Sequence, residues 1–515
     1  MFFIRKPLGR KKNNSKDPPF IDQSLPENLN SDITCNVAEI NSRISLIPDM
    51  VIREFVIQQT GKRAALVYLL GLTDKNAINN NILKPLLHNS IAGEVVDGEL
   101  PVAIGNIRWL TEWSKVEQAI FQGYSVLFID GRTDALALDT QGWPQRAIED
   151  PQLEASLKGA HQGFVETAGQ NIALVRRYIP NRELKVKQLR VGARGRTQIL
   201  LVYLGDVANP EILQELEDRI SQLDVDAIVS SGELAEYIED NPYSPFPQFI
   251  STERPDAAAS QLLQGRVMII VDGSPVVIIA PASISTFFQN VDDYGTRWLV
   301  SSFLRMLRFF AFFVALCLPS FYIALISYNY DLLPVKLLLT IGESRAGVPF
   351  PPLVEALMME ITLEMMREAG VRLPAPIGQT VGIVGGIVIG QTAVQAGIVS
   401  NIMVVIVSFT AIASFILPNH DMSSGVRLLR FPMMFITFLF GIVGLVIGMM
   451  IIMAHLVSLE SLGTPYGSPF APMRFSDWKD TFFRLPVWKM NKRPTGARAI
   501  QEDRQGSSRP KGDGK

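Results

Sequence analysis

The sequence predicts an α/β cytoplasmic region of two similar lobes, followed by an α-helical multi-span membrane domain. Two observations lead to this fold class. First, Asp, Glu, Lys and Arg are absent from three long stretches in the second half of the chain, at 309–330, 373–420 and 431–459. Second, the region before residue 290 has an ordinary soluble composition and contains one strand-and-turn pattern twice.

The three charge-free stretches predict four membrane spans. The middle stretch would be about 70 Å long as a single helix, roughly twice the ~30 Å thickness of a hydrocarbon core. It must therefore fold back once, and the polar and flexible residues at 395–401 favour a turn there. Pro319 lies within the first span and should kink it, because proline removes a backbone hydrogen bond. We expect spans near 308–328, 376–395, 400–418 and 431–455, inside a membrane domain at 300–458.

Basic residues predict that both ends of the chain lie in the cytoplasm. The apolar run at the N-terminus is too short for a signal peptide, so we do not expect export of the soluble region. Arg305 and Arg308 precede the first span, and further basic residues follow the last span in a cytoplasmic tail at 459–515. The positive-inside rule then places both flanks in the cytoplasm, although Arg427 and Arg430, between the third and fourth spans, count against this topology.

The soluble region contains the same unit twice. The tetrapeptide Leu-Val-Tyr-Leu occurs at 66–69 and at 201–204, and each copy opens a strand-then-helix pattern. Downstream, 122–131 matches 264–273, because in both segments Gln-Gly ends a helix, apolar residues form a strand and Asp-Gly turns a hairpin. We therefore predict a disordered arm at 1–35, a first lobe at 36–150, a linker helix at 151–178 and a second lobe at 179–290.

Neither lobe carries a motif for catalysis or metal binding. The sequence has no Walker loop and no glycine-rich turn between a strand and a helix. The four histidines are scattered, and neither they nor the two cysteines have the spacing of a zinc site. We therefore expect no enzyme activity, no cofactor and no metal. The net charge of −2 is too small to indicate a nucleic-acid partner.

The segment 332–372, between the first and second spans, is apolar but broken by glycines and prolines. It carries Glu343 and Arg345, and then an acidic stripe that includes Glu360 and Glu364. Two interpretations stay open. The segment is either interfacial, with its acidic stripe in water, or a re-entrant hairpin buried among the spans. The second interpretation requires a water-filled path beside the charges, because a charge at the bilayer centre costs at least about 2.5–3.5 kcal/mol. We interpret it as a charged segment at the mouth of a pore.

The predicted second span has glycine at every fourth position, so one face of this helix has no side chains. Such a face allows close approach of a neighbouring helix in a bilayer. Two glutamines follow one turn apart, and they either strengthen a helix interface or line a polar conduit. The glycines are Gly378, Gly382, Gly386 and Gly390, and the glutamines are Gln391 and Gln395.

Several longer motifs are shared with a known family. They are Ser244-Pro-Phe-Pro-Gln248, Gly347-Val-Pro-Phe-Pro351, the glycine-rich stretch at 377–391 and the tail segment at 480–490. These motifs resemble those of the GerA family of spore germination proteins, and the likeness covers nearly everything from 60 to 498. The chain departs from the family pattern at 158–161, which leaves the start of the linker helix undefined.

This resemblance implies an A-type subunit of a nutrient germinant receptor, a multi-pass protein in the inner membrane of a spore. Such subunits are thought to oligomerise into a cation channel that opens when nutrient is sensed. Their partners are a permease-like B subunit, which binds the nutrient, and a lipoprotein C subunit. We therefore expect a homo-oligomer in the lipid bilayer, with the span at 376–395 lining the pore.

Three alternatives stay open. A paralogue associated with the dipicolinate-release apparatus shares the same motifs. A secondary transporter with broken helices would use the glycines and prolines at 334–349 as unwound segments. Finally, the spans could serve only as an anchor for a scaffold, with a proline-bounded loop as its subunit contact; this loop is Pro245, Phe246, Pro247 and Gln248.

Overall fold

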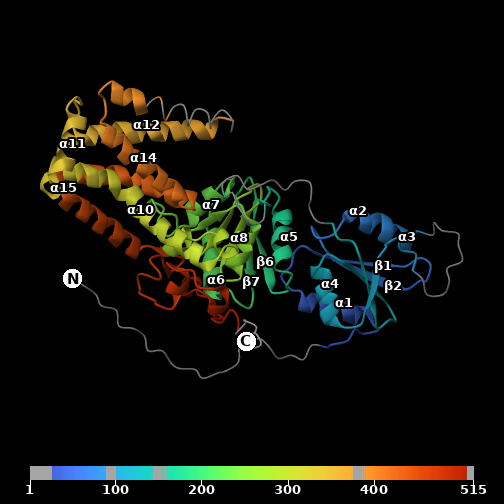
Figure 1. The fold of residues 1–515 in the computed structure, drawn as a ribbon. Coiled ribbons are helices and arrows are strands. Elements are labelled where there is room, and N and C mark those ends of the chain that lie inside the picture. Colours follow the sequence, from blue (N-terminus) through green and yellow to red (C-terminus); the bar gives the residue numbers. More distant parts are fainter. Residues whose placement is uncertain are drawn as a thin grey trace, which may run out of the picture. The chain divides into compact units, whose positions relative to one another are not determined.

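The computed structural model describes residues 26–88, 100–142, 161–374 and 390–506, together with residues 154, 159, 386 and 388 (Figure 1). The chain divides into two compact units. The first unit reaches Thr140 and holds one five-stranded sheet. The second unit runs from Gln141, includes the short segments Arg43–Met50 and Leu69–Asp74, and holds a second five-stranded sheet together with the long helices.

The first unit is a sheet flanked by short helices. Its strands are β1 (Met50–Val56), β2 (Arg63–Leu69), β3 (Ile107–Leu110), β4 (Ser125–Ile129) and β5 (Ala135–Leu138), and its helices are α1 (Ile33–Arg43), α2 (Lys75–Ala77), the π-helical turn η1 (Ile78–Leu83), α3 (Lys84–Leu87) and α4 (Trp113–Phe121). The strand order is β1-β2-β4-β5-β3, and the pairs β2–β4, β4–β5 and β5–β3 are antiparallel. Leu66 and Leu127 of the central strands pack on Ile78 and Ile82, which ties η1 to one face of the sheet.

The second sheet has both faces covered by helices. Its strands are β6 (Leu184–Val191), β7 (Thr197–Leu204), β8 (Ile250–Thr252), β9 (Val267–Val271) and β10 (Val277–Ala280), and its helices are α5 (Ala168–Tyr178), α6 (Pro210–Ser221), α7 (Ser231–Ile238) and α8 (Pro255–Leu262). The order is β6-β7-β9-β10-β8, and every pair is antiparallel. Successive side chains of a strand point to opposite faces, so Leu200 packs with α5 and α8 while Leu201 packs with α6 and α7.

The matched motifs occupy the same positions in the two sheets. The two Leu-Val-Tyr-Leu copies lie in β2 and β7, each second in its sheet, and the two apolar runs downstream form β4 and β9, each third. Their glycines also agree, because Gly131 and Gly273 both have positive φ, of 80° and 91°, in the turn that follows the strand. An L side chain rarely adopts this backbone conformation, which explains the Asp-Gly pair in both motifs.

The linker helix is shorter than the predicted 151–178. Among the described residues it begins at Ala168, after Thr167, and the preceding residues 161–167 are not helical. Phe164 and Val165 are buried nonetheless. The backbone N–H of Val165 donates to the Asn171 side-chain oxygen at 2.8 Å, and the Asn171 side-chain amide donates to the Val165 carbonyl oxygen at 2.6 Å. This local hydrogen bonding replaces the helical pattern, so amphipathic spacing alone misplaced the start of the helix.

The helical part of the second unit follows the second sheet. Its helices are α10 (Trp298–Ser327), α11 (Val335–Arg345), α12 (Pro352–Arg372), α14 (Asn401–Ile416) and α15 (His420–Ser458). Among the described residues, α10 and α15 are long and apolar enough to cross a membrane, and α14 is a shorter apolar helix. Helix α10 begins ten residues before the predicted first span, at 298 instead of 308. Most of the predicted second span lies outside the described residues, but Gly386, Val388 and 390–395 are helical.

Helix α15 reverses direction, which contradicts a single straight span at 431–455. Gly441 has φ 60° and ψ −142°, a conformation that is not helical. A Cβ on Gly448 would overlap the Met433 sulfur, and a Cβ on Gly444 would overlap the Ile436 carbonyl oxygen. In a straight helix, residues 433 and 448 would be about 22 Å apart. The two arms of α15, before and after Gly441, therefore pack against each other as a tight hairpin.

Candidate functional site: buried charges between the long helices

The start of α10 is held by buried ion pairs. Arg308 binds both carboxylate oxygens of Asp293, at 2.8 and 2.9 Å, and Arg305 binds Asp293 at 2.9 Å and Asp480 of the C-terminal tail at 2.7 Å. Burial alone would raise the pKa of Asp293, but the two guanidinium groups outweigh it and the pKa is lowered. These pairs explain why the helix begins before the apolar stretch, since its charged first turns are part of the protein interior.

Another buried arginine satisfies the carbonyl group that a proline leaves free. Pro319 has no N–H, so the carbonyl oxygen of Ala315, four residues earlier, lacks its helical partner. The Arg430 Nε atom of α15 donates to this oxygen at 2.8 Å. The same guanidinium pairs with Glu360 of α12, and both side chains are only 4% exposed. One side chain thus joins α10, α12 and α15.

Further charges continue along α12 on either side of this pair. Glu364 binds Arg367 at 2.6 Å and Arg427 of α15 at 3.4 Å. Arg427 also donates to the hydroxyl groups of Ser423 at 3.0 Å and Ser424 at 2.9 Å. Acidic residues of the α12 stripe therefore form ion pairs with arginines of α15, so only part of the stripe faces water.

At the other end of α12 the buried acid is Glu355. Its carboxylate accepts from the backbone N–H of Ser400 at 3.0 Å and pairs with Arg345 of α11 at 3.0 Å. Ser400 is the N-cap of α14, where a negative charge is stabilised by the helix dipole. Glu355 therefore joins α11, α12 and the start of α14.

The predicted pore-mouth residues have different surroundings. Arg345 and Glu360 are in the network above, Glu364 is half-exposed, and Glu343 is exposed on α11. Sequence reasoning missed Glu355, and it interpreted Arg427 and Arg430 only as topology signals. Arginine and glutamate residues next to apolar sequence were the available signal, but their pairing depends on the reversal of α15.

The glycine-rich helix has an open flank. A Cβ on Gly386 would meet no atom within 4 Å, and one on Gly390 would meet only Val404 of α14, at 3.8 Å. Gln391 and Gln395 are both exposed. Gly378 and Gly382 lie outside the described residues. Among the described residues, the glycine face is therefore open at Gly386, whereas Gly390 is buried next to α14.

The Pro-Phe-Pro-Gln loop connects the second sheet to both arms of α15. Phe246 is 1% exposed and packs on the ring of His455, with 6.1 Å between ring centroids. The Ser244 hydroxyl lies 2.9 Å from Nε2 of His455. The Pro245 carbonyl oxygen is so close to Gly425 that a Cβ on this glycine would overlap it. Gly425 and His455 lie on opposite arms of α15, so the loop contacts both.

The position of this loop bears on its predicted role. Pro245 and Phe246 make contacts inside the chain, and Gln248 is buried, with hydrogen bonds to the backbone of Asn241 at 3.0 and 2.6 Å. The neighbouring Tyr243 is 95% exposed. Contact of the loop with another subunit stays a prediction, and it would involve Tyr243 more readily than Phe246.

A cavity lies between the second sheet and the helices. Its volume is about 620 Å³, and Arg308, Arg367, Arg427 and His420 are among its lining residues. In the part of the chain that the structure describes, no group of three His, Cys, Asp or Glu side chains could hold a metal ion. The chemistry of this region is that of paired charges that join the helices to one another and to the C-terminal tail.

These features define a class of protein: an α/β region whose second unit carries long apolar helices held together by buried ion pairs. The family model for the Bacillus/Clostridium GerA spore germination protein matches residues 38–496. The chain therefore belongs to the GerA family.

Several relatives extend along most of the chain. Spore germination protein A1 of Bacillus subtilis (strain 168) is 41% identical over 421 residues, covering 82% of this chain and 87% of the relative. Spore germination protein KA of the same strain is 39% identical over 492 residues, covering 94% and 90%. The uncharacterized membrane protein YfkQ of that strain is also 39% identical, over 92% of this chain and 93% of its own length.

One solved structure is similar to part of the chain. It is the N-terminal domain of the A subunit of the Bacillus megaterium spore germinant receptor GerK3, which is 30% identical. The match covers 50% of this chain and 98% of that domain, with a TM-score of 0.40.

Proposed function

We propose that this chain is an A-type subunit of a spore germinant receptor, and that it oligomerises into a nutrient-gated cation channel in the inner membrane of the spore. Membership of the GerA family and the spore germination relatives support the receptor role. The proposed partners are further copies of this chain, a permease-like B subunit and a lipoprotein C subunit.

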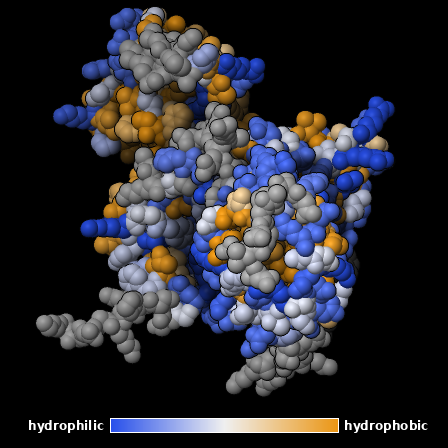
Figure 2. All heavy atoms as spheres, turned by 90° about the vertical axis from the view of Figure 1, so that its right-hand side faces the viewer, coloured by the Kyte–Doolittle hydropathy of each residue, from blue (hydrophilic) through white to orange (hydrophobic). Residues whose placement is uncertain are grey.

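The long helices are proposed to lie in the bilayer. Many large apolar side chains on them are exposed, and Figure 2 shows hydrophobic side chains gathered on the helical part, in the upper half of the view. Exposure of so many such groups to water is unfavourable. The exposed residues include Phe303 and Phe310 of α10, Phe409 and Phe415 of α14, and Phe440, Val443 and Met450 of α15.

The reversal of α15 supports a cytoplasmic position for the second sheet. Arg427 is two residues from Gly425, which touches the loop at Pro245, so this arginine lies at the sheet end of its helix. In the sequence, Arg427 and Arg430 opposed a cytoplasmic location for both flanks. With α15 folded as a hairpin, they lie near the same end as Arg305 and Arg308, as the positive-inside rule requires.

The segment 332–372 is proposed to lie among the helices and beside the conduction path. Glu355 and Glu360 are buried against other helices of the chain, which favours the buried interpretation over a purely interfacial one. Glu343 keeps an exposed carboxylate group, which would attract cations to a wet path, whereas the half-exposed Glu364 is paired with Arg367 and Arg427.

The open flank at Gly386 is the observation that carries the oligomeric proposal. Among the described residues, nothing lies within 4 Å of the position of a Cβ on Gly386, although a glycine face in a bilayer allows close helix packing. A second copy of the chain is the proposed occupant. The exposed Gln391 and Gln395 would then lie towards the pore.

Replacing Gly386 by Leu tests this proposal. The new side chain would separate the two helices, so spores that carry Gly386→Leu should lose cation release in a nutrient mixture that triggers wild-type spores. Val388→Leu is the matched control, because Val388 is 53% exposed and two residues further along, about 200° around the helix. Immunoblotting gives the protein level, and cross-linking gives the oligomer. Normal cation release from Gly386→Leu spores would refute the proposal.

Two alternative functions make different predictions. The break at Gly441 is the feature that a transporter would explain, since half-helices frame many transport sites. Saturable uptake of a labelled solute into vesicles that contain this chain alone would support that function over the channel. A role beside the dipicolinate-release apparatus is separated by gene context, because a receptor subunit should have permease-like and lipoprotein genes as neighbours.

A further inference from the structure

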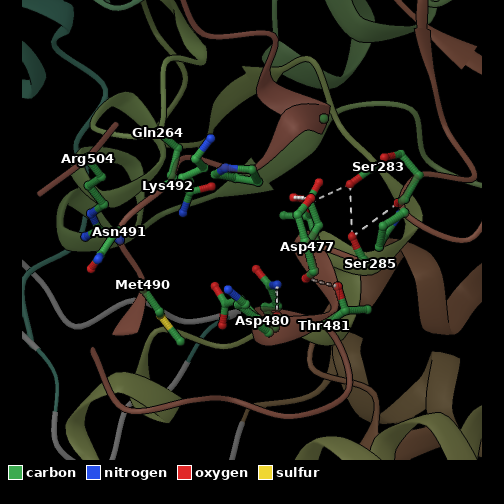
Figure 3. Close-up of a pocket in the computed structure, with 18 of the residues that line it drawn as sticks. Gln264, Ser283, Ser285, Asp477, Asp480, Thr481, Met490, Asn491, Lys492 and Arg504 are labelled. Carbon is green, nitrogen blue, oxygen red and sulfur yellow. Dashed lines mark hydrogen bonds between the residues drawn. The ribbon is translucent and has the colours of Figure 1, made fainter. Parts of the chain in front are cut away.

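A second cavity lies away from the charged helices, where the C-terminal tail covers the second sheet. Its volume is about 300 Å³. One wall comes from the start of β9 and the turn η2 (Ile284–Phe288), and the other comes from tail residues between 468 and 504. Figure 3 shows Ser283 and Ser285 on one side of the cavity, and Asn491, Lys492 and Arg504 on the other.

Arg266 forms the buried wall of this cavity. It is 2% exposed, and its guanidinium donates to the Thr286 hydroxyl at 3.0 Å and to the side chain of Gln261. Its Nε has no hydrogen-bond partner, and no carboxylate pairs with it, among the residues that the structure describes. Burial lowers the pKa of Arg266 to about 10, because water no longer stabilises its positive charge.

Several other buried arginines of this unit are paired with acids, whereas Arg484 donates to the backbone carbonyl oxygens of Tyr294 and Thr296, both at 3.3 Å. Arg176 binds Asp49 at 3.0 Å, and Arg254 binds Asp256 at 2.7 Å. A buried cation without a carboxylate is costly unless another anion approaches it. Arg266 therefore has the position and the free N–H of a ligand-binding side chain.

Hydroxyl groups lie next to the guanidinium. The Ser283 hydroxyl is 3.1 Å from that of Ser285 and 3.2 Å from that of Thr286, which itself accepts from Arg266. A hydroxyl proton rotates to suit a new acceptor. The three side chains are thus a set of donors at the cavity wall.

The tail adds positive charge to the opposite wall. Its cationic lining residues are Lys479, Lys489, Lys492 and Arg504, and its two acids are Asp477 and Asp480. Asp480 pairs with Arg305 at 2.7 Å, and Lys492 pairs with Glu502 at 3.3 Å. Asp477 accepts from Thr495 and keeps its negative charge, so Arg266, Lys479, Lys489 and Arg504 outnumber it. The charge that remains available to a ligand is therefore positive.

We propose that this cavity binds a phosphate group. A planar guanidinium, flexible ammonium groups and several hydroxyls match the oxygens of an anionic, tetrahedral phosphate group. The phosphate can belong to an anionic phospholipid headgroup or to a soluble phosphate compound. The cavity adjoins the start of α10 through the Arg305–Asp480 pair, and exposed Phe475, Phe483 and Trp488 lie in the same tail, as in a membrane-interface belt.

Binding to the purified full-length chain tests the proposal. One arm titrates inorganic phosphate by calorimetry in detergent. The other compares flotation with vesicles of phosphatidylglycerol and of phosphatidylcholine. The first variant is Lys489→Gln/Lys492→Gln, which changes exposed side chains; the Lys492–Glu502 pair that it removes is also exposed and contributes little to stability. Arg266→Gln is the second, and the matched control is Arg194→Gln/Arg196→Gln, which removes the same charge from the exposed hairpin between β6 and β7.

Saturable phosphate binding that falls about tenfold or more in both cavity variants, and not in the control, supports a phosphate site open to soluble ligands. A headgroup site is supported by a different result: the chain prefers phosphatidylglycerol vesicles and does not bind phosphate in solution. The cavity variants should then lose this preference, and the control should keep it. If Arg266→Gln does not fold, the lysine variant decides alone. Absence of both kinds of binding, or equal losses in the lysine variant and the control, would overturn the proposal.

Discussion

The pair Arg430–Glu360 allows a quantitative test of how the helices are held together. Replacing Arg430 by Met removes the partner of Glu360 and the donor to the Ala315 carbonyl oxygen. Replacing Glu360 by Met leaves Arg430 with the carbonyl but without its counter-charge. The double variant removes both charges and places two apolar side chains between α12 and α15.

The expected costs follow from burial. Removing one partner of a buried ion pair costs about 3–5 kcal/mol, because the other charge stays buried without compensation. A carbonyl group left without a donor adds about 1–3 kcal/mol for Arg430→Met. Replacing both charges by apolar groups is often close to neutral, so the double variant should cost only about 1–3 kcal/mol, from the carbonyl alone.

Thermal unfolding in detergent micelles, followed by tryptophan fluorescence, measures these differences. Each single variant should lower the apparent Tm by roughly 5–10 °C, and the double variant by much less. Adding Pro319→Ala to Arg430→Met should recover part of the loss, because alanine restores a backbone N–H at position 319 that can bind the Ala315 carbonyl oxygen. If the double variant shows the sum of the two single losses, the charges are not coupled and the reasoning fails.

Two further changes test the α15 hairpin and a buried carboxyl group, Glu239, at the C-terminal end of α7. Gly441→Ala should destabilise the chain by about 1–3 kcal/mol, because the φ of 60° at this position is strained for an L residue. Gly342→Ala in helix α11 is the control and should be neutral or stabilising. Similar Tm changes for the two variants would contradict the hairpin. Burial raises the pKa of Glu239 to about 7, so the folded state favours the protonated carboxyl group. The resulting contribution to the free energy of unfolding is fully present below about pH 4.5 and is lost as the pH rises through 7. Glu239→Gln should therefore become more stable relative to the wild type, by about 1–2 kcal/mol, between pH 5 and 8, and a difference in Tm that does not change with pH would count against the raised pKa.

Much of the fold could be predicted from local patterns. The repeated Leu-Val-Tyr-Leu and Asp-Gly motifs occupy matching strands and turns, since apolar runs and left-handed glycines report on local backbone conformation. The charge-free stretches became the apolar helices α10, α14 and α15. These features depend on residues close together in the sequence.

Three of the errors and omissions have a common cause. The start of α10, the reversal at Gly441 and the role of Glu355 all depend on partners far along the chain. Arg305 is 175 residues from Asp480, and Arg430 is 70 residues from Glu360. Hydropathy counts a charge as a cost, and it cannot tell that the charge has a counter-ion.

The sequence by itself determined the apolar helices, the two sheets and the family, because each follows from composition, periodicity or motifs within one segment. Only the tertiary structure decided that α15 folds back, that one arginine replaces the donor lost at Pro319, and that Arg266 stays buried without an acid. Those outcomes depend on which side chains meet across the core. In a low-dielectric interior, the free energy of a charge is set by its neighbours in space.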